Sequence, residues 1–257
     1  MMLRIFALGW SGFLQLLRSK VYLNLLVAGV FLVVTSWVID ELSGGMAGRV
    51  TIDLGLALCS VVTAILAGVS SIVSVTRQME TQEIHLLLAR PMARFEFVLG
   101  RFLTSIALVL LSNLVFGLLL AGMVFAMGTE GAWRVLAASL FVSFEGIIVV
   151  SIALFFGVKS SSTMSAVFTT TLFLLGRLTL PILDLIQSGK FSGMGETALK
   201  GTYALLPHLF AFDLSVWART GKGIDVAELG QAALYGLFYA LVFIAFSSAR
   251  LENKDLL

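Results

Sequence analysis

Residues 77–101 read RQMETQEIHLLLARPMARFEFVLGR and interrupt a chain that is otherwise almost entirely apolar. This stretch carries four arginines, three glutamates and a histidine. The segments on either side, Leu54–Thr76 and Phe102–Thr129, contain no charged residue. Apolar runs of about 18 residues or more are long enough to cross a lipid bilayer as helices. The alternation therefore predicts a charged segment held between two membrane-spanning helices.

The composition of the whole chain points to the same class. Of 257 residues, 59% are hydrophobic and 12% are charged, whereas about a quarter of the residues of a soluble domain are charged. Further spans of sufficient length are Val21–Ile39, 135–158, 163–183 and Leu229–Ala249. The sequence therefore predicts an all-α membrane protein with six transmembrane helices in a single domain over residues 1–257.

Residues 1–19 form a predicted helix of a different kind. On a helical wheel, one polar stripe collects Arg4, Ser11, Gln15 and Arg18. The remaining surface is apolar and includes Phe6 and Trp10, a pattern typical of helices that lie in the membrane interface. An N-terminal extension of the first span is the alternative interpretation.

The distribution of basic residues predicts the orientation. Arginine and lysine concentrate in cytoplasmic loops, and with six spans both termini lie on one side of the membrane. That side collects Arg4, Arg18, Lys20, Arg77, Arg90, Arg94, Arg101, Lys159, Arg250 and Lys254. The two short loops on the opposite side carry one each, Arg49 and Arg134. We therefore expect both termini and residues 77–98 to be cytoplasmic.

The connection over residues 184–228 is predicted to lie outside. Glu196–Leu206 has a helical pattern, Pro207 breaks it, and Leu209–Arg219 resumes it. The aromatic residues of this connection argue against a disordered loop, and Asp225 suits the N-cap of the last span. The sequence thus predicts a hairpin of two short amphipathic helices in a re-entrant segment at the outer face.

Two ionisable residues fall inside predicted spans, Glu145 in the fourth and Arg177 in the fifth. Counted from the cytoplasmic ends of antiparallel neighbours, both lie at a depth of about 18–21 Å. Because a lone charge in mid-membrane costs at least about 2.5–3.5 kcal/mol, we expect the two side chains to pair. The pair has two alternative roles, a polar lining of a transport pathway or a structural clamp between the spans.

Within the charged segment, Pro91 divides two predicted helices. Proline disfavours the helical conformation of the residue before it, so that a first helix ends near Arg90. Pro91 itself suits the first turn of the next helix. Composition alone leaves two interpretations equal, a docking surface for a soluble partner and a solvated loop.

The motifs of this segment resemble those of ABC-2 type permeases, the membrane subunits of one class of ATP-driven transporter. The matching residues are LLLARP (86–91), Arg94, GR (100–101) and the tail NKDL (253–256). Gln78 stands where the family commonly has an acidic residue, and Gln82 and Glu83 stand where it has Gly-Thr. The resemblance covers the whole length and diagnoses the superfamily rather than the cargo.

The resemblance implies a mechanism. Two permease subunits, identical or different, pair in the lipid bilayer, and a dimer of cytoplasmic ATPase subunits binds below them. Residues 77–98 would be the coupling segment that contacts the ATPase, through Arg77, Glu80, Glu83, His85, Arg90, Pro91 and Arg94. ATP and Mg²⁺ would be bound by the partner, so that this chain holds no cofactor and is not an enzyme by itself. A bacterial inner membrane, work as an exporter or mechanotransmitter, and an envelope accessory protein as a further partner are also implied.

Other functions find less support in the residues. No Gly-x-x-x-x-Gly-Lys-Ser/Thr phosphate loop occurs, and the scattered basic residues do not indicate nucleic-acid binding. A membrane-embedded lipid-modifying enzyme needs a nucleophile with a base, or a metal cluster, whereas Cys59 and His208 are isolated. An ion-driven secondary transporter often has inverted repeats and interrupted helices, and we predict neither. These two classes are the alternatives, and we expect no catalytic, cofactor-binding or metal-binding residues.

Overall fold

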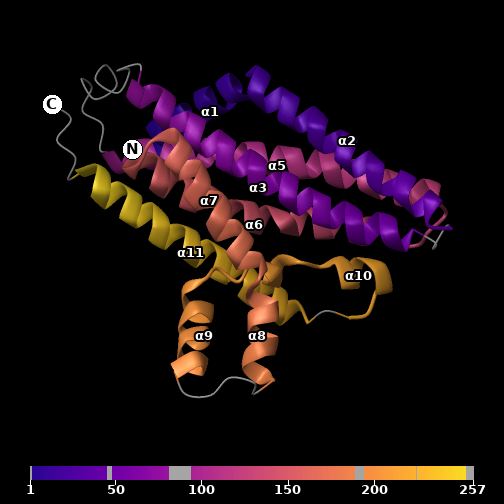
Figure 1. The fold of residues 1–257 in the computed structure, drawn as a ribbon. Helices are drawn as coiled ribbons and strands as arrows, with labels where there is room; N and C mark the ends of the chain where they lie inside the picture. The colour runs from indigo at the N-terminus through magenta and orange to yellow at the C-terminus, as the bar shows by residue number, and fades with distance from the viewer. Residues whose placement is uncertain (1, 45–47, 81–93, 189–193, 224, 253–257) are drawn as a thin grey trace.

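The computed structural model describes residues 2–44, 48–80, 94–188, 194–223 and 225–252, and the regular elements in these ranges are all helices (Figure 1). In chain order they are α1 (Met2–Leu17), α2 (Lys20–Leu42), α3 (Arg49–Glu80), α5 (Arg94–Ala126), α6 (Ala132–Lys159), α7 (Ser162–Arg177), α8 (Thr179–Gln187), α9 (Met194–Leu205), the 3-10 helix η1 (Leu209–Phe212), α10 (Ser215–Thr220) and α11 (Val226–Glu252). Among the described residues, α2, α3, α5, α6 and α11 are long and apolar enough to cross a membrane. The all-helical fold and the multi-pass pattern predicted from composition are therefore present.

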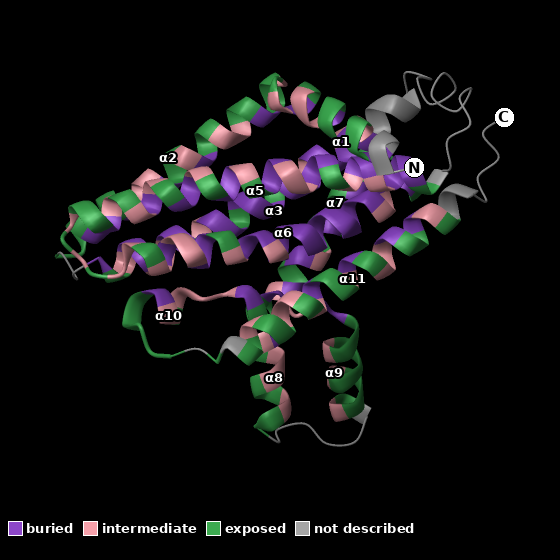
Figure 2. Ribbon diagram, turned by 180° about the vertical axis from the view of Figure 1, so that it is seen from behind, coloured by how far each residue is buried: buried purple, intermediate pink, exposed green. Residues whose placement is uncertain are grey.

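The centre of the molecule is formed by α3, α5 and α6, with α2 on one side and α11 on the other (Figure 1). Burial is greatest along α6, which Figure 2 shows mostly in purple. The helices approach closely where one of them has a glycine, as is common in membrane bundles. A Cβ atom on Gly146 of α6 would lie 2.6 Å from Val109 of α5, and one on Gly29 of α2 would lie 2.6 Å from Phe116. Larger residues at these two positions would separate the helices.

The N-terminal helix α1 covers the end of the bundle at which α5 begins. Thr104 of α5 donates a hydrogen bond to the carbonyl of Gly9 at 3.0 Å, while Phe6 and Trp10 are 68% and 55% exposed. The extent of α1 agrees with the predicted helix over residues 1–19. Its exposed aromatic side chains are those that suit a membrane interface, and its interfacial position stays a prediction.

The predicted fifth span, residues 163–183, is not one continuous helix. It consists of α7 and α8, which meet at an angle of 42°. Pro181 explains the break, because a proline lacks the N–H and its ring clashes with the carbonyl four residues earlier, here that of Arg177. Next to the break, Thr179 donates its hydroxyl to the carbonyl of Gly176 at 2.9 Å. The break lies at the one predicted span that contains a proline, and among the described residues no second bent pair of apolar helices stands at a matching position.

We call residues 179–220 the lateral segment, because α8 and α9 lie side by side and project away from the bundle (Figures 1 and 2). The predicted helix over 196–206 corresponds to α9. The predicted continuous helix over 209–219 is wrong, since η1 and α10 are separate. Leu209 and Phe212 of η1 are 0% and 1% exposed. Because both side chains are buried against the bundle, the chain turns between η1 and α10 instead of continuing as one helix. Asp225 accepts a hydrogen bond from the N–H of Ala227 at 2.9 Å, which fits the predicted cap of α11.

Candidate functional site

Arg177, the last residue of α7, is the centre of a charged cluster inside the bundle. Its Nε lies 3.0 Å from Oε1 of Glu145 on α6. Its Nη2 lies 3.5 Å from Glu145 Oε2 and also donates to the hydroxyl of Ser60 on α3. Its Nη1 lies 3.7 Å from Oδ2 of Asp213, between η1 and α10. One guanidinium thus joins side chains from three helices and the lateral segment.

Glu145 lies in the middle of α6, and its side chain is 2% exposed. Ser60 donates a hydrogen bond of 2.8 Å to Glu145 Oε2. A carboxylate at such a buried position needs these partners, because an uncompensated buried charge costs several kcal/mol. The depth argument from the sequence pairs Glu145 with Arg177, and the structure places them in contact. Their role, pathway lining or clamp, stays a prediction.

Ser60 and Asp213 are members of the cluster that sequence reasoning missed. Ser60 is one of several serines in α3, and nothing in its spacing distinguishes it. Asp213 lies within a stretch predicted as an outer amphipathic helix. The aromatic run of η1 immediately before Asp213 is visible in the sequence, but its docking against α6 and α7, which carries the carboxylate to the cluster, is not.

The charges of the cluster do not balance. One guanidinium faces two carboxylates, so the ionised cluster has one positive and two negative groups, a net charge of −1. The Arg177 and Asp213 side chains are 24% and 27% exposed, whereas Glu145 is closed off. The described residues contain no group of three or more His, Cys, Asp or Glu side chains that could hold a metal ion. When both carboxyl groups are ionised, this arrangement can hold a further positive charge.

A second polar layer lies beside the cluster and joins the three central helices. Thr63 of α3 donates to Asn113 Oδ1 of α5 at 2.7 Å, and Asn113 Nδ2 donates to Ser143 of α6 at 3.1 Å. Asn113 is 0% exposed. Hydrogen bonds between membrane helices contribute about 0.6 kcal/mol each on average, so this layer fixes the register of α3, α5 and α6 more than it adds stability.

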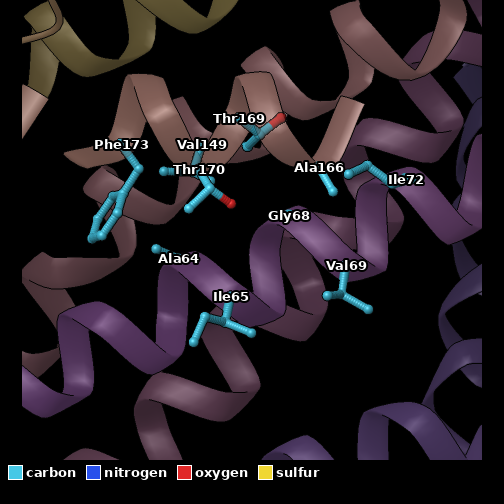
Figure 3. Close-up of a pocket in the computed structure, with 10 residues that line it drawn as sticks. All are labelled: Ala64, Ile65, Gly68, Val69, Ile72, Val149, Ala166, Thr169, Thr170 and Phe173. Atoms are coloured by element: carbon cyan, nitrogen blue, oxygen red, sulfur yellow. The ribbon is translucent and has the colours of Figure 1, made fainter. Parts of the chain in front are cut away.

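A pocket of about 100 Å³ opens between α3 and α7, with α6 behind it (Figure 3). Its walls are largely apolar, from Ala64, Gly68 and Phe173 among others. Thr170 of α7 directs its hydroxyl into the space between the two helices (Figure 3). The sequence gives no indication of this pocket, because it depends on how α7 sits against α3.

His208 lies at the base of the lateral segment, between two tyrosines. Its Nδ1 is 3.3 Å from the hydroxyl of Tyr235, and its ring centroid is 4.3 Å from that of Tyr203. Burial lowers the pKa of His208 below its ordinary value, because the neutral imidazole tolerates desolvation better than the charged form. These contacts make His208 a packing residue of the lateral segment.

The predicted coupling residues are placed only in part. α3 continues through Arg77 to Glu80, and α5 begins at Arg94. Glu83, His85, Arg90 and Pro91 lie outside the described residues, as do the side chains of Arg77, Glu80 and Arg94.

No family model and no curated protein matches the chain.

Proposed function

We propose that this chain is the transmembrane permease subunit of an ATP-driven transporter of the ABC-2 type. It would work as a homodimer or heterodimer in a bacterial inner membrane, as an exporter or mechanotransmitter. ATP and Mg²⁺ would be bound by separate cytoplasmic ATPase subunits, and an envelope accessory protein is compatible with the arrangement. In this proposal, the bent pair α7–α8 is the fifth of six spans, α11 is the sixth, and both termini are cytoplasmic.

The observation that carries the proposal is the length of the two helices that flank the charged segment. α3 has 32 residues and α5 has 33, so each is about 48–50 Å long. The hydrocarbon core of a bilayer is about 30 Å thick, and both helices therefore extend beyond it. Because α3 and α5 pack on α6 and on each other, a force applied to residues 81–93 would reach the bundle centre directly.

The arrangement of the chain ends supports the same proposal. α1 begins, α3 ends, α5 begins and α11 ends at one end of the bundle (Figure 1). Among the basic residues assigned to the cytoplasm, Arg4, Arg77, Arg94, Arg101 and Arg250 belong to the helix ends gathered there, and Lys159 ends α6 at the α6–α7 turn. Arg18 and Lys20 lie at the junction of α1 and α2. An ATPase bound at this end would face the charged segment and α1 together.

An ion-driven secondary transporter is the second candidate, and one observation favours it. Transporters of that class bind substrate and coupling ions near the midplane, at discontinuous helices. Arg177 stands at the break between α7 and α8, and in this second candidate the break would be such a discontinuous helix. The two candidates differ in their energy source, since only the first needs an ATPase partner.

Charge reversal in the coupling segment tests the first candidate. We expect Glu83→Lys and Arg90→Glu to reduce co-purification of an ATPase chain at least about tenfold, because each reversal would repel a complementary charge on the partner. Glu130→Lys, at an exposed position outside the segment, is the matched control. Undiminished ATPase association in both segment variants would contradict the proposal, and transport that persists without any ATPase would favour the second candidate.

A further inference from the structure

The pocket and the charged cluster are consecutive layers of one region. Three residues that line the pocket, each on a different helix, lie one helical turn from a member of the cluster: Ala64 from Ser60, Val149 from Glu145 and Phe173 from Arg177. Four residues of α-helix advance about 6 Å and return to the same face. The apolar pocket therefore lies about one helical turn from Ser60, Glu145 and Arg177, and a molecule that extends one turn beyond the pocket would reach Arg177 and its partners.

The pocket suits a short alkyl group. Its volume of about 100 Å³ is somewhat smaller than that of an apolar cavity of about 150 Å³ that holds one benzene molecule. Its walls belong to α3, α6 and α7. On α3, the small residues Ala64 and Gly68 leave room for a ligand beside the helix backbone.

The cluster next to the pocket selects the charge of a ligand. When both carboxyl groups are ionised, the net charge of the cluster is −1, which disfavours an anionic head group and favours a cationic one. The Asp213 carboxylate is the weaker partner of Arg177, at 3.7 Å, and it is partly exposed. A compact metal ion is disfavoured, because the guanidinium occupies the space between the carboxylates and ions such as Ca²⁺ need six to eight oxygen ligands. An organic cation needs only one close carboxylate.

We propose that this region is a binding site for a small lipophilic cation of the alkylammonium class. Its alkyl chain occupies the pocket between α3 and α7, and its ammonium group lies against the carboxylate of Asp213. Arg177 remains paired with Glu145 when the cation is bound. That such a cation is the cargo rests on the proposed permease function, whereas its binding to the purified chain does not.

Calorimetry on the purified full-length chain, in nanodiscs of zwitterionic lipid, tests the binding step without any ATPase. The probes are hexyltrimethylammonium, hexyl sulfate and hexanol, which share one alkyl chain, and empty nanodiscs provide the blank. We expect saturable binding of hexyltrimethylammonium, and binding of the other two at least about tenfold weaker because they lack the positive charge. Equal binding of all three, or no saturable binding of the cation, would overturn the proposal.

Variants locate the site. Asp213→Asn should lower the affinity for hexyltrimethylammonium about tenfold, whereas Glu130→Gln removes an equal charge at an exposed position elsewhere and should leave it unchanged. Thr170→Leu and Ala166→Leu, both at exposed lining positions of α7 where folding should tolerate them, fill the pocket and should also weaken binding. If both leucine variants elute as folded protein and bind the cation as before, the pocket is not the site. If Glu130→Gln weakens binding as much as Asp213→Asn, the effect is one of surface charge and the site is again refuted.

Discussion

At the scale of single residues, the position of Arg177 at the end of α7 determines which side chains its guanidinium contacts. A guanidinium in the middle of a continuous helix would reach its neighbours on one or two facing helices. Because α7 ends at Arg177 and the chain turns away at Leu178, the lateral segment can return to the same level and bring Asp213 within 3.7 Å. Gly176 permits this return, since the backbone of the lateral segment passes close to it.

The stability of variants that lack single charges should show how much the pair of Arg177 and Glu145 contributes to folding. We expect Arg177→Leu to lower the unfolding free energy by about 3 kcal/mol, at the lower end of the range of about 3–5 kcal/mol for broken buried pairs, because the guanidinium is partly exposed. The double variant Glu145→Gln/Arg177→Leu should regain most of this loss, since an uncharged amide then replaces the buried carboxylate. Thermal unfolding of the purified variants measures both effects.

Lys200→Leu is the control for this series. Lys200 pairs with Glu196 at 2.6 Å on α9, and both side chains are well exposed. Exposed pairs contribute about 0–1 kcal/mol, so the melting temperature should change little. A double variant no more stable than Arg177→Leu alone would speak against the clamp role and for the pathway role of the pair.

His208 should make the stability of the protein depend on pH. Because burial lowers the pKa of His208 in the folded state, the unfolded chain binds a proton more readily. This contribution to stability is complete above the ordinary histidine pKa of about 6.5 and is lost as the pH falls below it and through the lower pKa of the folded state. Melting temperatures measured between pH 5 and pH 8 should therefore fall at the acidic end. The fall should be smaller in His208→Asn, and an identical pH profile in both proteins would contradict this origin.

At the scale of helices, charge-free runs were sufficient to predict where the long elements lie. Leu54–Thr76 and Leu229–Ala249 fall inside α3 and α11, because a span needs no more than length and apolarity. The break after Arg177 could have been predicted more sharply, since Pro181 stands four residues later in an otherwise regular apolar run. The position of Asp213 could not, because it depends on the docking of η1 against helices distant in sequence.

Gly176 should tolerate a methyl group poorly. A Cβ atom there would lie 2.8 Å from the carbonyl oxygen of Pro207 and 2.9 Å from the Leu209 side chain. Overpacking of this kind costs about 1–3 kcal/mol, so Gly176→Ala should lower the melting temperature. Gly122 of α5 has nothing within 4 Å of a Cβ position, and Gly122→Ala should be neutral or stabilising by up to about 1 kcal/mol. Equal melting temperatures in the two variants would show that the lateral segment does not press against α7.

At the scale of the whole molecule, one face of the bundle is closed by two different structures. α7 covers the groove between α3 and α6 over part of its length, and α10 covers it near the other end. Two ion pairs hold these structures in place. Arg177 of α7 pairs with Asp213 of the lateral segment, and Arg219 of α10 pairs with Asp53 of α3 at 2.9 Å. The lateral segment is thus tied to the same central helix that leads to the charged segment.

The lone cysteine makes the predicted orientation easy to test. Cys59 is 0% exposed and should not react with a maleimide in the folded protein. We expect Lys200→Cys, on α9, to be labelled in intact cells by a membrane-impermeant maleimide, and Lys159→Cys to be labelled only after permeabilisation. The reverse pattern would invert the topology and place the charged segment outside, which would remove the basis of the ATPase proposal.

The uninterrupted course of α3 has a mechanical consequence. A rod of 32 residues is about 48 Å long, and a tilt of about 10° around its midpoint would swing Asp53 sideways by about 3 Å. A displacement of this size would break the ion pair between Asp53 and Arg219, whose N–O distance is 2.9 Å. If α3 tilts as a rigid rod, either the contact between Asp53 and Arg219 breaks or α10 moves with α3. A force applied at the Glu80 end of α3 would therefore displace α10 at the opposite end.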